Sequence, residues 1–141
     1  KISKRIAYEI KAGINKQSTY KNYFKKVFDH GKKLHTLIKK IKRENKSIYG
    51  FGASTKGNVL LQNSKIDKDL LRGIFEVNKE KFNKFTPYSK IKILDEKKLK
   101  NIKVDFILLL IWHFRGYVIK KIKKLNSNTK IIIPFPKIKI I

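Results

Sequence analysis

The stretch YGFGASTKGN, residues 49–58, carries the residue types in this chain that are best suited to holding a phosphate group. Its glycines let the backbone turn sharply and let a ligand approach it, and a helix that starts after such a loop points free N–H groups at an anion. The spacing of Gly50, Gly52 and Gly57 is two residues longer than that of the dinucleotide-binding fingerprint, and the Gly-Lys-Ser/Thr ending of a P-loop is absent. The stretch therefore predicts either a phosphate-binding loop or a tight turn between a strand and a helix. The candidate binding residues are Gly50, Gly52, Ala53, Ser54, Lys56, Gly57 and Asn58.

A second candidate is Glu76, which follows Gly52 by 24 residues and ends an apolar segment. In nucleotide-binding sheets, an acidic residue about 20 positions after the glycine-rich loop, at the tip of the second strand, binds a ribose hydroxyl. We therefore expect Glu76 and its neighbour Asn78 to lie beside the glycine-rich loop and to contact a ligand. The alternative is an exposed carboxylate that balances nearby lysines.

The third candidate is the aromatic stretch Trp112-His113-Phe114, which follows the most apolar segment of the chain. Trp112 and Phe114 could stack on a base or line a cleft. His113 is a weak candidate for acid–base catalysis, because no carboxylate partner is visible and a lone histidine is more often structural. The catalytic residue is unknown from the sequence. We expect His30 and His35 to face outward from a helix, and we expect no metal site.

Alternating strand and helix patterns must position these candidates. Apolar residues at three- and four-residue steps predict a helix over 18–44 with Ser18 as its N-cap, whereas residues 1–17 show no strong period and form a lead-in. A helix at 53–63 should bury Val59, Leu60 and Leu61. Together the pattern predicts a single α/β domain over 18–141, a Rossmann-like, doubly wound and mainly parallel sheet preceded by a long amphipathic helix. Predicted strands are 47–51, 70–78, 90–94, 104–112 and 129–135, and further helices are 95–101 and 115–125.

The formal charge of +26 predicts nonspecific attraction to polyanions at low salt. Arginine, the residue best suited to base readout, is scarce, whereas lysines are spread along the whole chain beside abundant isoleucine and asparagine. That mixture is typical of an AT-rich genome. Specific nucleic-acid binding therefore remains an alternative.

Cysteine content and the lengths of the apolar runs limit where the protein can reside. Cysteine is absent, which rules out disulfides and thiolate chemistry and fits a reducing compartment, so we expect a cytoplasmic location. The longest apolar runs fall far short of the roughly 20 residues of a membrane span. The chain does not begin with methionine, and we expect it to be part of a longer protein.

Five motifs taken in order resemble the C-terminal domain of sugar C-methyltransferases. They are IYGFGASTKGNVLLQ, FEVNKEKF, TPYSKIKI, VDFILLLIWHF and IIIPFPKIKII, and the resemblance runs from about residue 20 to the end. Members of that family are multidomain enzymes that use S-adenosylmethionine to methylate a carbon of a nucleotide-linked sugar. The resemblance implies a Rossmann-like domain that helps to hold the nucleotide-sugar. It also implies no cofactor in this domain, because S-adenosylmethionine is bound by a preceding domain, so the domain alone should not be catalytic.

The chain departs from the family pattern in the loop from 79 to 92. Lys79 stands where the family often has proline, and Asn83 and Tyr88 stand where it has glycine. His113 also replaces an asparagine. Two alternatives follow: a structural or assembly domain whose nucleotide site has decayed, or a basic module that binds nucleic acid through lysines gathered on a single face.

Overall fold

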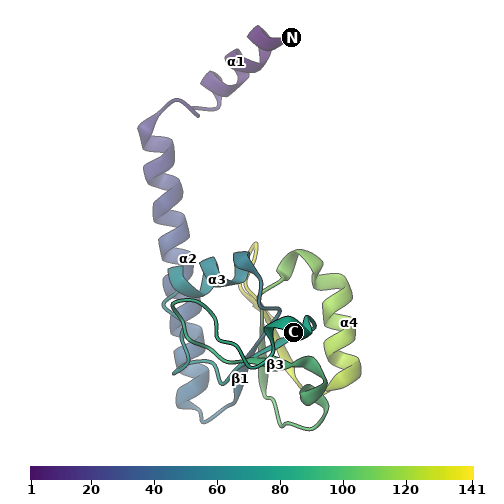
Figure 1. Ribbon diagram of the computed structural model, residues 1–141. Helices are drawn as coiled ribbons and strands as arrows, with labels where there is room; N and C mark the ends of the chain where they lie inside the picture. Colours follow the sequence, from purple (N-terminus) through teal and green to yellow (C-terminus); the bar gives the residue numbers. More distant parts are fainter.

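The computed structural model describes residues 1–141 and shows a six-stranded sheet with helices on both faces (Figure 1). The strand order is β3-β2-β1-β4-β5-β6, and every neighbouring pair is parallel except β5 and β6. Strand order that runs outward from β1 in both directions is the doubly wound, Rossmann-like arrangement that the sequence predicted. The strands are β1 (Ile48–Phe51), β2 (Ile74–Glu76), β3 (Ile93–Asp95), β4 (Phe106–Leu109), β5 (Lys130–Ile133) and β6 (Lys139–Ile140).

Helices form the outer layers. On one face lie α2 (Gln17–Arg43) and α3 (Thr55–Asn63), and on the other lie α4 (Arg115–Leu125) and the 3₁₀ helix η2 (Glu96–Lys100). The 3₁₀ helices η1 (Lys79–Lys81) and η3 (Trp112–Phe114) follow β2 and β4, and α1 (Ile2–Lys11) precedes α2. No helix combines the length and the apolar composition needed to cross a membrane.

Each face of the sheet has its own hydrophobic core. Leu34 and Ile38 of α2 pack with Leu61 of α3 against one face, and Val118 and Ile122 of α4 pack against the other. The central strand β4 alternates between the two, since Leu108 joins the first core and Ile107 the second. A strand covered on both faces explains the uninterrupted apolar run in the sequence.

Several element boundaries differ from the prediction. β2 begins only at Ile74, because Leu70 and Leu71 lie in the turn before it, and β5 ends at Ile133, the residue before the helix- and strand-breaking Pro134. The two-residue strand β6 was not predicted. Val59 was expected to be buried but is 63% exposed, since α3 turns this side chain away from the sheet.

The amino-terminal region also corrects the prediction. α2 begins at Gln17 with Lys16 as N-cap, so Ser18 lies inside the helix and caps nothing. Residues expected to lack regular structure form α1. With 27 residues, α2 is about 40 Å long at 1.5 Å per residue, much longer than the strands it covers. Its first half and α1 therefore project beyond the carboxyl ends of the strands (Figure 1).

Candidate functional site

The glycines of the loop after β1 are required by crowding. Gly52 has φ of +87°, and a Cβ there would lie 2.7 Å from Ile111 side-chain atoms. A Cβ on Gly50 would lie 2.9 Å from Ile74, and one on Gly57 would lie 2.8 Å from Leu110 Cβ. These distances are shorter than ordinary carbon contacts, so the loop is a tight turn that brings α3 close to the end of β4.

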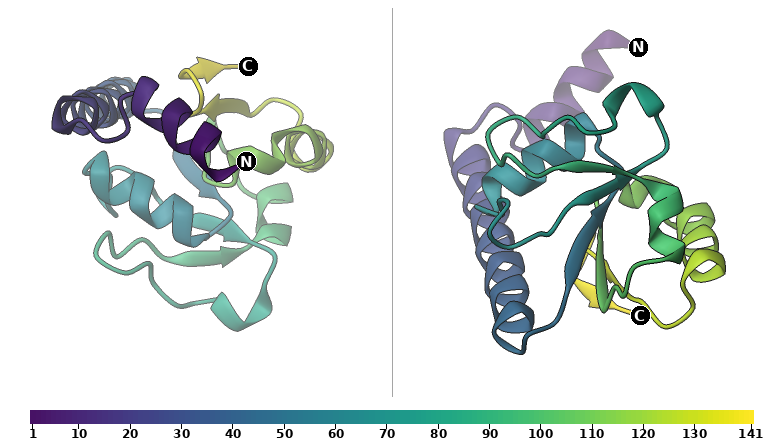
Figure 2. Two further views of the ribbon diagram at one scale, coloured as in Figure 1. Left: turned by 90° about the horizontal axis from the view of Figure 1, so that it is seen from above. Right: turned by 60° about the horizontal axis from the view of Figure 1, so that its bottom comes forward.

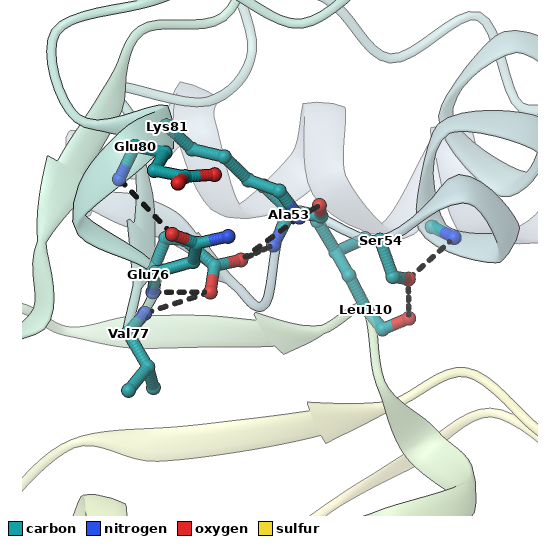
Figure 3. Close-up of polar contacts among 9 residues, drawn as sticks. Ala53, Ser54, Glu76, Val77, Glu80, Lys81 and Leu110 are labelled. Atoms are coloured by element: carbon teal, nitrogen blue, oxygen red, sulfur yellow. Dashed lines mark hydrogen bonds and ion pairs between the residues drawn. The ribbon is translucent and has the colours of Figure 1, made fainter.

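Most N–H groups of this loop are already bonded within the protein. The Gly52 amide donates to Phe75 O at 2.8 Å and the Ser54 amide donates to Gly52 O at 2.9 Å. Ser54 is the N-cap of α3, and its Oγ accepts from the Gly57 amide at 3.0 Å (Figure 3). The amides of Thr55 and Lys56 make no hydrogen bond, as is usual in the first turn of a helix. The loop therefore offers two free donors to a ligand.

Glu76 lies beside the loop, as expected, but its carboxylate is occupied by backbone groups. Oε2 accepts from the Ala53 amide at 2.7 Å, and Oε1 accepts from the amides of Val77 and Asn78 at 2.8 and 2.9 Å (Figure 3). Lys81 Nζ donates to Ala53 O at 2.9 Å and lies 4.0 Å from Glu76 Oε2. Glu76 thus ties the loop after β1 to the turn after β2.

Asn78 and Asn58 make hydrogen bonds only with nearby residues of the chain. Asn78 Oδ1 accepts from the Glu80 backbone N–H at 3.0 Å and caps η1. The backbone N–H of Asn58 donates to Ser54 O at 2.9 Å within the first turn of α3. Neither residue contacts the aromatic residues of the candidate site through these bonds.

Trp112 lines an apolar pocket of about 300 Å³ at the carboxyl edge of the sheet. Its ring lies 4.8 Å from that of Phe135, centroid to centroid, at an angle of 49°. Lys56 stands at the same pocket, so the structure brings together two residues that were predicted separately. Sequence reasoning missed Phe135 and Tyr23, because they come from the segment after β5 and from α2, far from the glycine-rich loop. The lining residues are Tyr23, Val27, Lys56, Val59, Leu60, Asn63, Trp112 and Phe135.

His113 and Phe114, the two residues that follow Trp112, lie outside this pocket. Phe114 is 62% exposed, and the His113 ring packs 4.7 Å from it. His113 makes no hydrogen bond or ion pair with another residue, so no protein group orients it for proton transfer.

The two histidines of α2 do not face outward as expected. His35 Nδ1 lies 2.9 Å from Ser64 O, at the end of α3. The His30 ring stacks on Phe135 at 4.5 Å and 13°. Burial lowers the pKa of His30; the Pro134 backbone opposes this in part, and Lys33 adds a smaller lowering. Residues 1–141 contain no group of three potential metal-binding side chains.

Exposed lysines occur in both helical layers. Lys32 and Lys39 lie on α2, whereas Lys97, Lys120 and Lys124 lie on η2 and α4 across the sheet. This spread does not favour a single basic face of the kind that a nucleic-acid-binding module would present.

Comparison with known proteins agrees with the motifs. The chain matches the model of the family described as "C-methyltransferase C-terminal domain" over residues 1–136. It is 25% identical over 141 residues to the C-methyltransferase NovU of Streptomyces niveus, in an alignment that covers 99% of this chain and 34% of that protein. The chain thus spans about a third of the length of this curated relative. The family match covers nearly all of the chain, and the protein belongs to the C-methyltransferase C-terminal domain family.

Proposed function

We propose that this domain binds the nucleotide part of a nucleotide-linked sugar, and that another domain of the same protein methylates a carbon of that sugar. The observation that carries the proposal is the position of the aromatic pocket. It adjoins the first turn of α3, where Lys56 and two free amides stand. An apolar pocket next to anion-binding donors is the combination that a nucleoside diphosphate requires.

The pocket suits a flat ring better than a sugar. Aromatic side chains of Trp112, Phe135 and Tyr23 line it, and its polar groups are those of Lys56, Asn63 and the Tyr23 hydroxyl. Asn63 Nδ2 donates to Val27 O at 3.1 Å, which leaves its side-chain oxygen available to a base N–H. A polyhydroxyl ring would leave most of its hydroxyl groups without partners here, at a cost for each buried group.

The diphosphate would meet the start of α3. Of the amides in the glycine-rich loop, those of Thr55 and Lys56 remain free, and the helix dipole favours an anion at this end. Lys56 Nζ would add a charge-assisted hydrogen bond. This assignment is narrower than the one made from the sequence, because the protein itself uses the amides of Gly52, Ala53 and Ser54.

Glu76 is better described as a positioning residue than as a ligand for a ribose diol. Its two oxygens already accept three backbone N–H groups. A ribose held in the usual way would need that carboxylate free. As the family resemblance implies, we place the methyl donor and the catalytic base in another domain of a cytoplasmic enzyme.

The test uses thymidine diphosphate as the probe and the fluorescence of Trp112 as the signal. We expect saturable quenching that persists at moderate salt. Lys56→Gln should weaken binding about tenfold, since a hydrogen bond to a charged group contributes about 1.5 kcal/mol. Lys120→Gln removes the same charge from α4 and serves as the matched control. Equal loss in both variants, or quenching that disappears at moderate salt, would show that net charge alone attracts the nucleotide.

A further inference from the structure

We propose that α1 and the first half of α2, residues 1–28 and here called the arm, are the docking surface for a folded domain that precedes Lys1 in the same polypeptide. That domain would carry an apolar patch surrounded by acidic side chains. Tyr23 and Val27 of the arm also line the aromatic pocket. The inference rests instead on the exposed apolar residues of α1 and on Tyr20 and Phe24, so it does not depend on the nucleotide site.

The apolar face of α2 continues beyond the domain that it covers. In its second half, Leu34, Ile38 and Ile41 are buried against the sheet. Steps of three and four residues carry the same face back to Val27, Phe24 and Tyr20. Phe24 is 67% and Tyr20 47% exposed, and no residue of α2 before Gly31 is buried. An apolar stripe that is half covered and half bare indicates a missing neighbour.

α1 also has an exposed apolar face, and unlike α2 it has no buried residue at all. Ile2, Ile6 and Ile10 lie on one face at four-residue spacing, and each is more than half exposed. The helix has ten residues, no buried residue and no side-chain N-cap. Isolated helices shorter than about 12 residues are marginal in water, so contacts on the isoleucine face are needed to keep α1 folded.

The connection between the two helices has a defined geometry. Gly13 has φ of +72°, its amide donates to Ile10 O at 2.9 Å, and the Ile14 amide donates to Glu9 O at 3.1 Å. This pair of bonds is the Schellman arrangement that ends a helix in a fixed direction. Thr19 Oγ1 donates to Gly13 O at 2.7 Å and closes the corner from the side of α2.

The corner determines where α1 runs. Seen from above, α1 crosses over the sheet from the N-terminus and ends beside the free end of α2 (Figure 2). α1 and the free half of α2 therefore border the region above the carboxyl ends of the strands. A domain docked on the arm would lie above the edge of the sheet that carries the pocket.

Length and charge identify the occupant. The relative NovU is about three times longer than this chain, and the matched family is described as a C-terminal domain, so the additional length precedes the matched region. Glu9 is the only acidic residue of the arm, whereas lysines occur along the length of both helices. Two copies of this surface would repel each other, which disfavours a homodimer through the arm and favours an acidic partner surface.

The test compares the full-length gene product with the 141-residue chain by hydrogen–deuterium exchange. The sheet and its two cores lie within the shorter chain, which can therefore fold alone. We expect amides of α1 and of Gln17–Val27 to exchange at least tenfold more slowly in the full-length protein. The double variant Tyr20→Ser and Phe24→Ser should abolish that difference without lowering the melting temperature of the shorter chain. Tyr117→Ser, at a residue of α4 that is 70% exposed, is the matched control and should leave it unchanged.

Five results would overturn the proposal. One is a gene that encodes no domain before Lys1. Of the other four, the first is an arm that exchanges equally fast in both proteins. The second is protection that rises with concentration in the 141-residue chain, which would identify a second copy as the occupant. The third is protection that appears only with anionic phospholipid vesicles. The fourth is an equal response of the double variant and Tyr117→Ser.

Discussion

Two neighbouring loops at the carboxyl edge of the sheet both contain residues with positive φ, but they use different residue types there. The loop after β1 places glycine where φ is positive, at Gly52, and where α3 approaches β4, at Gly57. The loop between β2 and β3 also has positive φ, but there it uses Asn83, Tyr88 and Lys90, with φ of 61°, 61° and 50°. Tyr88 and Lys90 thus hold a left-handed backbone conformation that side chains other than those of glycine, asparagine and aspartate do not favour.

Crowding explains the difference. A Cβ on Gly52 would meet Ile111, whereas Tyr88 is 75% exposed and its side chain extends into solvent. Hydroxyl groups hold the second loop together: Thr86 Oγ1 and Ser89 Oγ lie 2.7 Å apart, and the Ile91 amide donates to Thr86 Oγ1 at 2.9 Å. Glycine is thus essential where packing forbids a side chain and replaceable where conformation alone favours it. The residues by which the second loop departs from the family pattern are therefore compatible with an intact loop backbone.

The largest expected effect comes from Gly52→Ala. The new methyl group would lie 2.7 Å from Ile111 and would hold alanine at φ of +87°. Left-handed strain and overpacking together should lower the free energy of unfolding by about 3 kcal/mol. Urea denaturation measures the change. Gly116→Ala is the control, because a Cβ there meets nothing within 4 Å, and an equal loss in both variants would refute the crowding argument.

A smaller loss is expected from Glu76→Gln, which breaks the tie between the first loop and β2. The amide would present an NH₂ group to backbone donors and leave at least one of them without a partner. An unsatisfied buried group costs about 2 kcal/mol, and this carboxyl side chain is 12% exposed. Thermal melts with Glu80→Gln as the exposed control test this expectation. An unchanged melting temperature would mean that water replaces the lost bonds.

A gain is expected in the second loop. Tyr88→Gly should raise the free energy of unfolding by about 0.5–1 kcal/mol, because relief of left-handed strain outweighs the greater freedom of glycine in the unfolded chain. Asn83→Gly should change it little, since asparagine tolerates this conformation. Tyr88→Ala, which removes the ring but keeps Cβ, should give no gain. If alanine stabilises as much as glycine, the ring and not the backbone is the source of the strain.

The smallest effect is expected where the His30 ring of α2 stacks on Phe135. Here stacked rings hold the segment after β5 in place, whereas glycines and hydroxyl groups stabilise the two loops compared above. Because its folded-state pKa lies below the ordinary value of 6.5, His30 binds its proton more readily in the unfolded chain. Its contribution to stability is therefore present above pH 6.5 and is lost as the pH falls through the lowered pKa. His30→Phe keeps a ring on Phe135 and should flatten the decline of melting temperature below pH 6.5. An equally steep decline in the variant would assign it to other groups.

Sequence periodicity predicted the elements that bury a regular apolar face, which is why α2, α4 and the five parallel strands were found. It failed where structure depends on few residues. Ile2, Ile6 and Ile10 are too few to establish a period before Gly13, and β6 is too short to show alternation.

Site residues were predictable only where spacing carries information. The spacing from Gly52 to Glu76 placed the two side by side. No spacing could show that the protein would bond to Glu76 itself, or that Phe135 and Tyr23 would meet Trp112, since those contacts depend on how distant segments pack.

The short strand β6 has a consequence for the solubility of the protein. It pairs antiparallel with β5 and covers the backbone groups of Lys130–Ile133, an isoleucine-rich strand that would otherwise end the sheet. An open apolar edge of this kind is a template for intermolecular strand addition. β6 replaces it with an outer edge that carries Lys139, and Lys137 precedes it in the connecting bend, so like charges on neighbouring molecules repel. Pairing with β6 thus protects β5 from intermolecular strand addition, and loss of β6 would expose this isoleucine-rich strand.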